Sequence, residues 1–332
     1  MGALQLTLSL GPSDKVAAIF DGRVSVEGCS LSLFPLGPEE AFQRAFLNED
    51  FDITELSASS AIVAVARGQN KYIALPIFLS RAFRHSAFYI RTDRNIRVPQ
   101  DLRGKIVGVP EYQMTAALWA RGVLSDEFGV LPQDIRWRNG GLNVPGRGER
   151  VPIKLPDSIE LQAVPATHTL SDMLEQGELD AIISARPPNC FVKRCANVGL
   201  LFPNYRSHEE AYFRKTGIFP IMHILAVRRS LIEQHRWLAN SVIKAFHEAK
   251  RLAYASMEEM AVLPTMLPWL QDDVERVRAV MGDDYWSYGF EKNKSSIEAM
   301  FRYSVEQGLS ERQLTANEFF ATGTLSSIHG KD

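Results

Sequence analysis

Two histidines and two glutamates stand where the chain could transfer protons. His85 and His223 lie in apolar surroundings, and Glu55 and Glu111 each separate a predicted strand from a predicted helix. Histidine titrates near neutral pH, so it can donate a proton to a substrate while a carboxylate orients its ring. We expect His223, supported by Glu55 or Glu111, to be the donor, with His85 as the alternative. Two simpler explanations stay open: core histidines held by hydrogen bonds, and glutamates that balance a helix dipole.

Arginines and helix starts could bind an anionic substrate. Arg81 precedes His85 by four residues, and Arg186 follows a segment that predicts a buried strand. Guanidinium groups bind carboxylates through paired hydrogen bonds, so these arginines predict a clamp for an anionic substrate, unless they are solvated like most of the 37 basic residues. Further candidates lie at two predicted strand-to-helix turns, where they could bind substrate or cap the helix: Ser57, Ser59, Tyr112, Gln113 and Thr115.

The motifs indicate neither a metal ion nor a phosphate-binding loop. The histidines and acids show no HExxH or comparable spacing. A metal site assembled from His85, His223 and Glu111 stays open as an alternative. The glycine-rich stretches at 140–141 and 146–148 lack the Lys-Ser/Thr ending of a phosphate-binding loop. The expected site therefore uses side chains alone.

The elements that position these residues form two α/β units. Apolar segments at 4–10, 29–34, 51–54 and 72–78 predict strands with helical segments between them, which is typical of a largely parallel sheet. A second unit begins at 85–91 and continues through a strand at 106–109 into a helix at 113–128. Open α/β sheets bind ligands beyond the carboxyl ends of their strands, where most of the candidates lie.

Three other segments complete the organisation. Residues 139–154 are rich in Gly, Pro and Arg, which predicts a mobile loop that could act as a lid. Apolar residues between 231 and 252 follow helical spacing and predict one long helix. The aromatic segment 283–289 could line a cleft or form an oligomer contact, so a homo-oligomer is one possibility.

Length and composition exclude several classes of protein. A chain of 332 residues with 45% hydrophobic and 23% charged residues predicts two globular domains. A net charge of −2, with both signs interspersed, argues against nucleic-acid partners. No apolar run approaches the length of a membrane helix, and the N-terminus lacks a signal-peptide pattern. Cys29, Cys190 and Cys195 show no paired spacing, so we expect reduced thiols and a cytoplasmic protein.

Several strings carry a resemblance to known families. Residues 98–110, VPQDLRGKIVGVP, resemble the stretch that opens the second lobe of type II periplasmic binding proteins and of related thiamine-precursor and nitrate/sulfonate binding families. The continuation 111–122, EYQMTAALWARG, resembles the 4,5-dihydroxyphthalate decarboxylase family, as do ELS at 55–57 and RAFRH at 81–85. This resemblance implies a two-lobed α/β fold with a ligand cleft between the lobes. It also implies a cytoplasmic lyase that converts 4,5-dihydroxyphthalate to protocatechuate and carbon dioxide without an organic cofactor.

The implied fold sets the domain limits and the competing functions. We expect lobe one at 1–84 plus 229–332 and lobe two at 85–228. The expected partner is a small aromatic dicarboxylate, with no nucleic acid and no membrane. The rival function is a solute-binding protein for an aromatic or other small anion, although such a protein needs no proton donor. An enzyme or sensor of the thiamine-precursor type would need a reactive-histidine motif and a Cys-rich iron segment, and the sequence shows neither.

Overall fold

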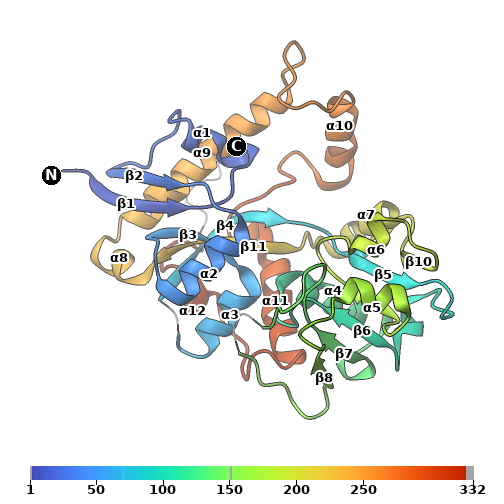
Figure 1. The fold of residues 1–332 in the computed structure, drawn as a ribbon. Coiled ribbons are helices and arrows are strands. Elements are labelled where there is room, and N and C mark those ends of the chain that lie inside the picture. The colour runs from blue at the N-terminus through green and yellow to red at the C-terminus, as the bar shows by residue number, and fades with distance from the viewer. Residues whose placement is uncertain (1, 70, 150–151, 327–332) are drawn as a thin grey trace.

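The computed structural model describes residues 2–69, 71–149 and 152–326, and it contains two separate sheets (Figure 1). The chain builds most of the first sheet, passes into the second sheet after residue 81, and returns to the first at residue 221. Each sheet and the helices that pack on it form one lobe. The predicted two-lobed α/β architecture is therefore confirmed.

The first lobe contains a five-stranded mixed sheet in the order β2-β1-β3-β11-β4. Strands β2, β1 and β3 are parallel, whereas β11 runs antiparallel between β3 and β4. Nine of the ten residues of β4 are buried, so this strand lies in the core. The strands are β1 (Leu4–Ser9), β2 (Cys29–Phe34), β3 (Ile53–Ser57), β4 (Tyr72–Arg81) and β11 (Ile221–Arg228), and the connecting helices are α1 (Asp14–Phe20), α2 (Pro38–Asn48) and α3 (Ala58–Ala66).

The second lobe contains a six-stranded sheet in the order β10-β5-β9-β6-β7-β8. Its strands are β5 (Phe88–Arg91), β6 (Ile106–Val109), β7 (Arg136–Asn139), β8 (Leu161–Ala163), β9 (Ala181–Ile183) and β10 (Val198–Leu200). Its α-helices are α4 (Thr115–Phe128), α5 (Leu170–Gln176), α6 (Asn189–Val192) and α7 (Tyr205–Thr216), with short 3-10 helices at His85–Ala87, Pro99–Leu102 and Pro132–Asp134. The helix α4 ends at Gly129, whose φ of 64° suits a glycine cap.

The C-terminal third is helical and returns to the first lobe. It comprises α8 (Arg229–Gln234), α9 (Leu238–Met257), α10 (Leu270–Met281), a 3-10 turn (Glu291–Asn293), α11 (Lys294–Glu306) and α12 (Ala316–Phe319). Helix α9 packs on α1, and α11 packs against α3 of the first lobe and α4 of the second. At this contact the ring of Tyr303 lies 2.3 Å from the position that a Cβ at Gly122 would occupy. Only glycine therefore allows α4 and α11 to approach so closely.

Two details of the organisation differ from the sequence-based expectation. The prediction of one long helix between residues 231 and 252 was wrong, because the non-helical backbone of His235 (φ −129°, ψ 76°) separates α8 from α9. Residues 221–228 form β11 in the first sheet, although the sequence-based division assigned them to the second lobe. The exact lobe limits stay a prediction. Among the residues described, no helix combines the length and apolarity needed to cross a membrane.

Candidate active site

The structure brings Glu55 and His223 into direct contact. His223 pairs with Ser57 across β3 and β11, and Glu55 lies two residues from Ser57 on the same face of the sheet. The Nδ1 atom of His223 lies 2.6 Å from Oε1 of Glu55. The ring of Phe42 meets the imidazole edge to face, with 4.8 Å between the ring centroids. A proton-carrying group is thus held between a carboxylate and an aromatic ring.

The surroundings of Glu55 fix its charge. Burial alone would raise the pKa of this carboxyl, but the hydrogen bond from His223, the N–H of Gly11 at 3.1 Å and the nearby charge of Lys15 hold the pKa below its usual value. An ionised carboxylate can only accept hydrogen bonds, so Nδ1 of His223 must carry the hydrogen. Because Nδ1 is held by Glu55, Nε2 is the other ring nitrogen that could exchange a proton with a ligand. The His223 side chain as a whole is 21% exposed.

Charged side chains from the two lobes form a cluster of ion pairs. Arg147 donates from Nε to Oε1 of Glu111 at 2.8 Å and from Nη1 to Oε1 of Glu39 at 3.3 Å. Nη2 of Arg186 lies 3.6 Å from the same Glu39 oxygen. Glu39 belongs to α2 of the first lobe, whereas Arg147, Glu111 and Arg186 belong to the second. These ion pairs therefore connect the lobes, and we call this region the lobe junction.

Helix α2 links the ion pairs to the histidine. Glu39 precedes Phe42 by three residues, and residues three apart on a helix have their Cβ atoms about 5–6 Å from each other. Phe42 contacts His223, while Glu39 contacts Arg147 and Arg186. The proton-carrying group and two guanidinium groups thus approach the same two turns of one helix.

The predicted serine and threonine candidates also meet at the lobe junction. Oγ1 of Thr115, the first residue of α4, lies 2.9 Å from Oγ of Ser57. The same Oγ1 accepts the backbone N–H of Ser59 at 3.1 Å. A hydroxyl group from the second lobe therefore occupies the N-terminus of α3, where the sequence suggested that a carboxylate could bind. Ser57, Ser59 and Thr115 therefore join the two lobes.

Tyr112 and Gln113 are held by the core of the second lobe. Their backbone N–H groups donate to the carboxylate of Glu149, at 2.5 Å and 3.3 Å. The buried ring of Tyr112 stacks on the guanidinium of Arg121, whose Cζ lies 3.7 Å from the ring centroid. Residues 140–149 contain no helix or strand, yet Glu149 and Arg147 tie this segment to Tyr112, Gln113 and Glu111.

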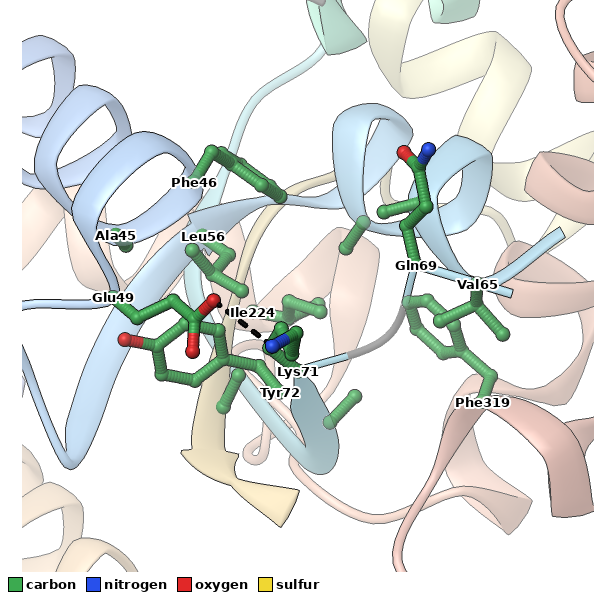
Figure 2. Close-up of a pocket in the computed structure, with 14 residues that line it drawn as sticks. Ala45, Phe46, Glu49, Leu56, Val65, Gln69, Lys71, Tyr72, Ile224 and Phe319 are labelled. Carbon is green, nitrogen blue, oxygen red and sulfur yellow. Dashed lines mark ion pairs between the residues drawn. The ribbon is translucent and has the colours of Figure 1, made fainter. Parts of the chain in front are cut away.

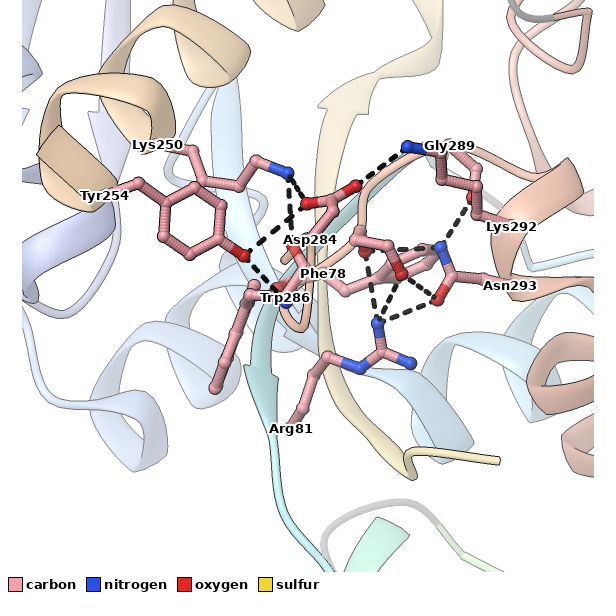
Figure 3. A network of polar contacts seen from close by, with 10 residues as sticks. Phe78, Arg81, Lys250, Tyr254, Asp284, Trp286, Gly289, Lys292 and Asn293 are labelled. Carbon is pink, nitrogen blue, oxygen red and sulfur yellow. Dashed lines mark hydrogen bonds and ion pairs between the residues drawn. The ribbon is translucent and has the colours of Figure 1, made fainter. Parts of the chain in front are cut away.

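Arg81 lies in a different network from Arg186. It donates to the carbonyl oxygen of Phe219 at 2.6 Å. It also donates to Oδ1 of Asn293 at 2.7 Å and to the carbonyl oxygen of Ser287 at 3.1 Å (Figure 3). Burial lowers its pKa to about 9. Arg186 is 72% exposed and meets Glu39 instead. The structure thus brings Arg147, which the sequence analysis did not select, rather than Arg81 into contact with the same carboxylate as Arg186.

His85 is packed among aromatic rings. Its ring centroid lies 5.3 Å from that of Phe202, 5.6 Å from that of Tyr212 and 6.4 Å from that of His208. Burial, assisted by the charge of His208, lowers the pKa of His85 to about 4, so its ring is neutral near pH 7.

Within the residues that the structure describes, no group of three or more His, Cys, Asp or Glu side chains is arranged so that it could hold a metal ion.

The buried His85 gives an expected pH dependence of stability. Its pKa rises from about 4 in the fold to its usual 6.5 on unfolding, so this contribution is fully present above pH 6.5 and is lost as the pH falls toward 4. The shift corresponds to at most roughly 3 kcal/mol. Urea unfolding between pH 7 and 4 should show the parental protein losing stability more steeply than His85→Gln. Glu209, whose pKa burial raises to about 7, acts in the opposite direction in both proteins. If the free energy of unfolding fell equally steeply with pH in the parental protein and in His85→Gln, the expectation would be contradicted.

Two cavities lie outside the lobe junction. A small one of about 40 Å³ is lined by Leu56 and Ile224 (Figure 2), whose side chains point to the opposite face of the sheet from Glu55 and His223. It has room for little more than one water molecule. A larger one of about 860 Å³ lies between α9, α10 and residues 283–292. There Asp284 pairs with Lys250 at 2.5 Å and with Lys292 at 3.0 Å (Figure 3), so both of these lysines contact the same carboxylate.

Comparison with known proteins places this arrangement in a family. The chain is 40% identical over 328 residues to the 4,5-dihydroxyphthalate decarboxylase of Comamonas testosteroni, covering 99% of both chains. It is 42% identical over 214 residues to the enzyme of the same name from Pseudomonas putida, covering 64% of this chain and 83% of that relative. No family model matches the sequence.

Solved structures show the same fold at low sequence identity. The periplasmic aliphatic sulphonate binding protein SsuA of Escherichia coli superposes with a TM-score of 0.54 at 14% identity, covering 100% of this chain and 95% of SsuA. A putative periplasmic sulfonate-binding protein of Methylobacillus flagellatus gives a TM-score of 0.51 at 12% identity, covering 97% and 92%. The lobes thus follow the periplasmic-binding-protein pattern, while identity over nearly the full length shows that the chain belongs to the 4,5-dihydroxyphthalate decarboxylase family.

Proposed function

We propose that the protein is a carboxy-lyase that converts 4,5-dihydroxyphthalate to protocatechuate and carbon dioxide. Its family relatives bear that name, and the Glu55–His223 pair at the lobe junction carries the proposal. The reaction needs a proton on the ring carbon that loses its carboxylate, and this pair can supply one.

The chemistry follows from the positions of the hydroxyl groups on the substrate. A hydroxyl para to the departing carboxylate pushes electrons into the ring, so Nε2 of His223 can protonate the carbon that bears the carboxylate. The C–C bond then breaks, its electron pair restores the aromatic ring, and carbon dioxide leaves. Glu55 stays ionised throughout, holding the imidazole in one orientation and stabilising its protonated form. No oxidant is consumed.

Arg147 and Arg186 are the proposed binding groups for the substrate carboxylates. Both guanidinium groups contact the carboxylate of Glu39, which has the same chemistry as the substrate groups. We expect the substrate to displace Glu39 and to place its ring against Phe42, beside His223. The apolar ring of Phe42 would favour the departing carboxylate as neutral carbon dioxide.

A turnover assay separates this function from the rival one of a solute-binding protein. The purified protein should release one carbon dioxide for each protocatechuate formed, and in D₂O each product should carry one deuterium at the former carboxylate carbon. Phthalate, which lacks the hydroxyl groups, is the control ligand and should not react. Tight binding of 4,5-dihydroxyphthalate without any release of carbon dioxide would identify a binding protein instead.

A further inference from the structure

Lys15, the second residue of α1, reaches across one face of the first sheet. Its Nζ lies 4.6 Å from the ring centroid of Trp286. Nε1 of Trp286 donates to the carbonyl oxygen of Phe78 in β4 at 2.8 Å, whereas Lys15 follows β1. In the sheet, β3 and β11 separate β1 from β4, a span of about 14 Å at the usual strand spacing. The contact between Lys15 and Trp286 therefore passes over the two strands that carry the candidate proton-donating pair.

The same face of the sheet carries the side chains of Glu55 and His223. The chain moves from β1 to β2 in one direction along the sheet, and from β2 past β1 to β3 in the other. Right-handed crossovers therefore place α1 and α2 on opposite faces (Figure 1). Leu56 and Ile224 line the small cavity together with side chains of α2 and α3. Because side chains alternate along a strand, Glu55 and His223 point to the face of α1.

Lys15 brings a positive charge and a hydrogen-bond donor to this face. An ammonium group has three N–H donors, and within the described residues that of Lys15 donates to Oγ of Ser13 at 3.1 Å and to Oδ1 of Asp14 at 3.4 Å. Its charge is close enough to Glu55 to help hold the pKa of that carboxyl below its usual value. A ligand beside His223 therefore lies near an ammonium group that has one N–H left to donate.

The two faces correspond to the two sides of the proposed substrate. In 4,5-dihydroxyphthalate both carboxylates lie on one side of the ring and both hydroxyl groups lie on the other. Glu39, whose carboxylate contacts Arg147 and Arg186, belongs to α2. Lys15 belongs to α1, on the opposite face of the sheet. A ring whose carboxylates displace Glu39 therefore turns its hydroxyl groups toward Lys15.

We propose that Lys15 binds the hydroxyl group para to the departing carboxylate in its ionised form, an assignment that rests on the proposed function. The hydroxyl group loses its proton to solvent on binding, and its oxygen accepts a hydrogen bond from Nζ, which stabilises the negative charge. Electron density from this oxygen enters the ring as Nε2 of His223 protonates the carbon that bears the carboxylate. The C–C bond then breaks, its electron pair restores the aromatic phenolate, and carbon dioxide leaves.

Binding measurements without turnover separate this role from one in which Lys15 only keeps Glu55 ionised. Phthalate has the carboxylates without the hydroxyl groups, whereas protocatechuate, the product, has both hydroxyl groups. Lys15→Met should raise the dissociation constant of protocatechuate by roughly 10- to 150-fold, the worth of a hydrogen bond to a charged group, and leave that of phthalate unchanged. At pH 7, protocatechuate bound to the parental protein should absorb at the longer wavelength of the ionised catechol. In complex with Lys15→Met it should not.

Two control substitutions accompany this measurement. Lys15→Arg keeps the charge, so it should retain most of the affinity for protocatechuate. Lys71→Met is the matched control, because Lys71 is 69% exposed, pairs with Glu49 and precedes β4 at the opposite end of the strand from Arg81. It should bind both acids like the parental protein.

Three results would overturn the role of Lys15. They are equal weakening of both acids by Lys15→Met, the absorption of un-ionised catechol in the parental complex, and a parental protein that binds neither acid. The turnover assay fails independently of these measurements. If the parental protein released carbon dioxide and Lys15→Met bound protocatechuate as tightly, the reaction would stand without Lys15. If no carbon dioxide were released and Lys15→Met weakened only protocatechuate, Lys15 would remain the hydroxyl-binding residue of a binding protein.

Discussion

Replacing His223 by glutamine is expected to lower the turnover number by roughly 10²–10⁴-fold, which is typical of a lost general acid, while substrate affinity changes little. Glutamine keeps the polarity and approximate size of the side chain but cannot donate a proton near neutral pH. The Nδ1 contact with Glu55 at 2.6 Å shows that the ring already has its orienting carboxylate. Steady-state kinetics of protocatechuate formation would measure the loss.

Two further variants test whether the loss of turnover comes from the Glu55–His223 pair. Glu55→Gln should lower turnover as well, because a neutral amide stabilises the protonated imidazole less than a carboxylate does. His168→Gln is the matched control, since His168 is exposed and hydrogen-bonded to the neighbouring Thr167. If His85→Gln abolished turnover and His223→Gln left it unchanged, the donor would be His85, and burial among aromatic rings would be part of its mechanism.

Local patterns were sufficient to predict much of the fold. The strand at 29–34 and the strand at 106–109 were predicted with the bounds that the structure has. The first alternates serine with apolar residues, the second is a short apolar run, and turn residues flank both. The start of α2 followed from Gly37 and Pro38, and its buried face from Ala41, Phe42 and Ala45. Such features depend on residues close in sequence, so no long-range information was required.

The pairing inside the candidate site could not be predicted in the same way. Glu55 and His223 are 168 residues apart, and their contact depends on β11 inserting antiparallel between β3 and β4. Local hydrophobic patterns do not specify which strands become neighbours. Glu55 and Glu111 therefore remained equal candidates in the sequence, and only the sheet order places Glu55 with His223.

Arg147 was missed for a related reason. It lies between two glycines in a segment whose composition predicts a mobile loop, and nothing in that composition indicates a binding residue. The available signal was an arginine in a glycine-rich loop near the carboxyl end of β7, a position where α/β folds often bind ligands. Arg81 was selected as a binding residue, but its guanidinium group donates to carbonyl oxygens of the protein itself. The sequence around a buried arginine of this kind does not differ from that around an arginine that binds a ligand.

Replacing Arg147 by glutamine is expected to raise the KM for 4,5-dihydroxyphthalate by roughly 10- to 150-fold, the equivalent of about 1.5–3 kcal/mol for a hydrogen bond to a charged group. The effect should fall mainly on KM, because this residue is proposed to bind a carboxylate rather than to transfer the proton. Arg147→Lys should give an intermediate value, since lysine keeps the charge but lacks the planar pair of donors.

Glu39→Gln provides the opposing test of the same arrangement. If Glu39 stands in for a substrate carboxylate, its neutral amide competes less for Arg147 and Arg186, so the KM should fall or stay the same. If the ion pairs serve only to hold the lobes together, Glu39→Gln should instead raise the KM and lower the thermal stability along with Arg147→Gln. Kinetic constants and unfolding temperatures measured on both variants would therefore distinguish a substrate-binding role for Arg147 from a structural one, because only the structural role predicts a higher KM and a lower thermal stability for Glu39→Gln.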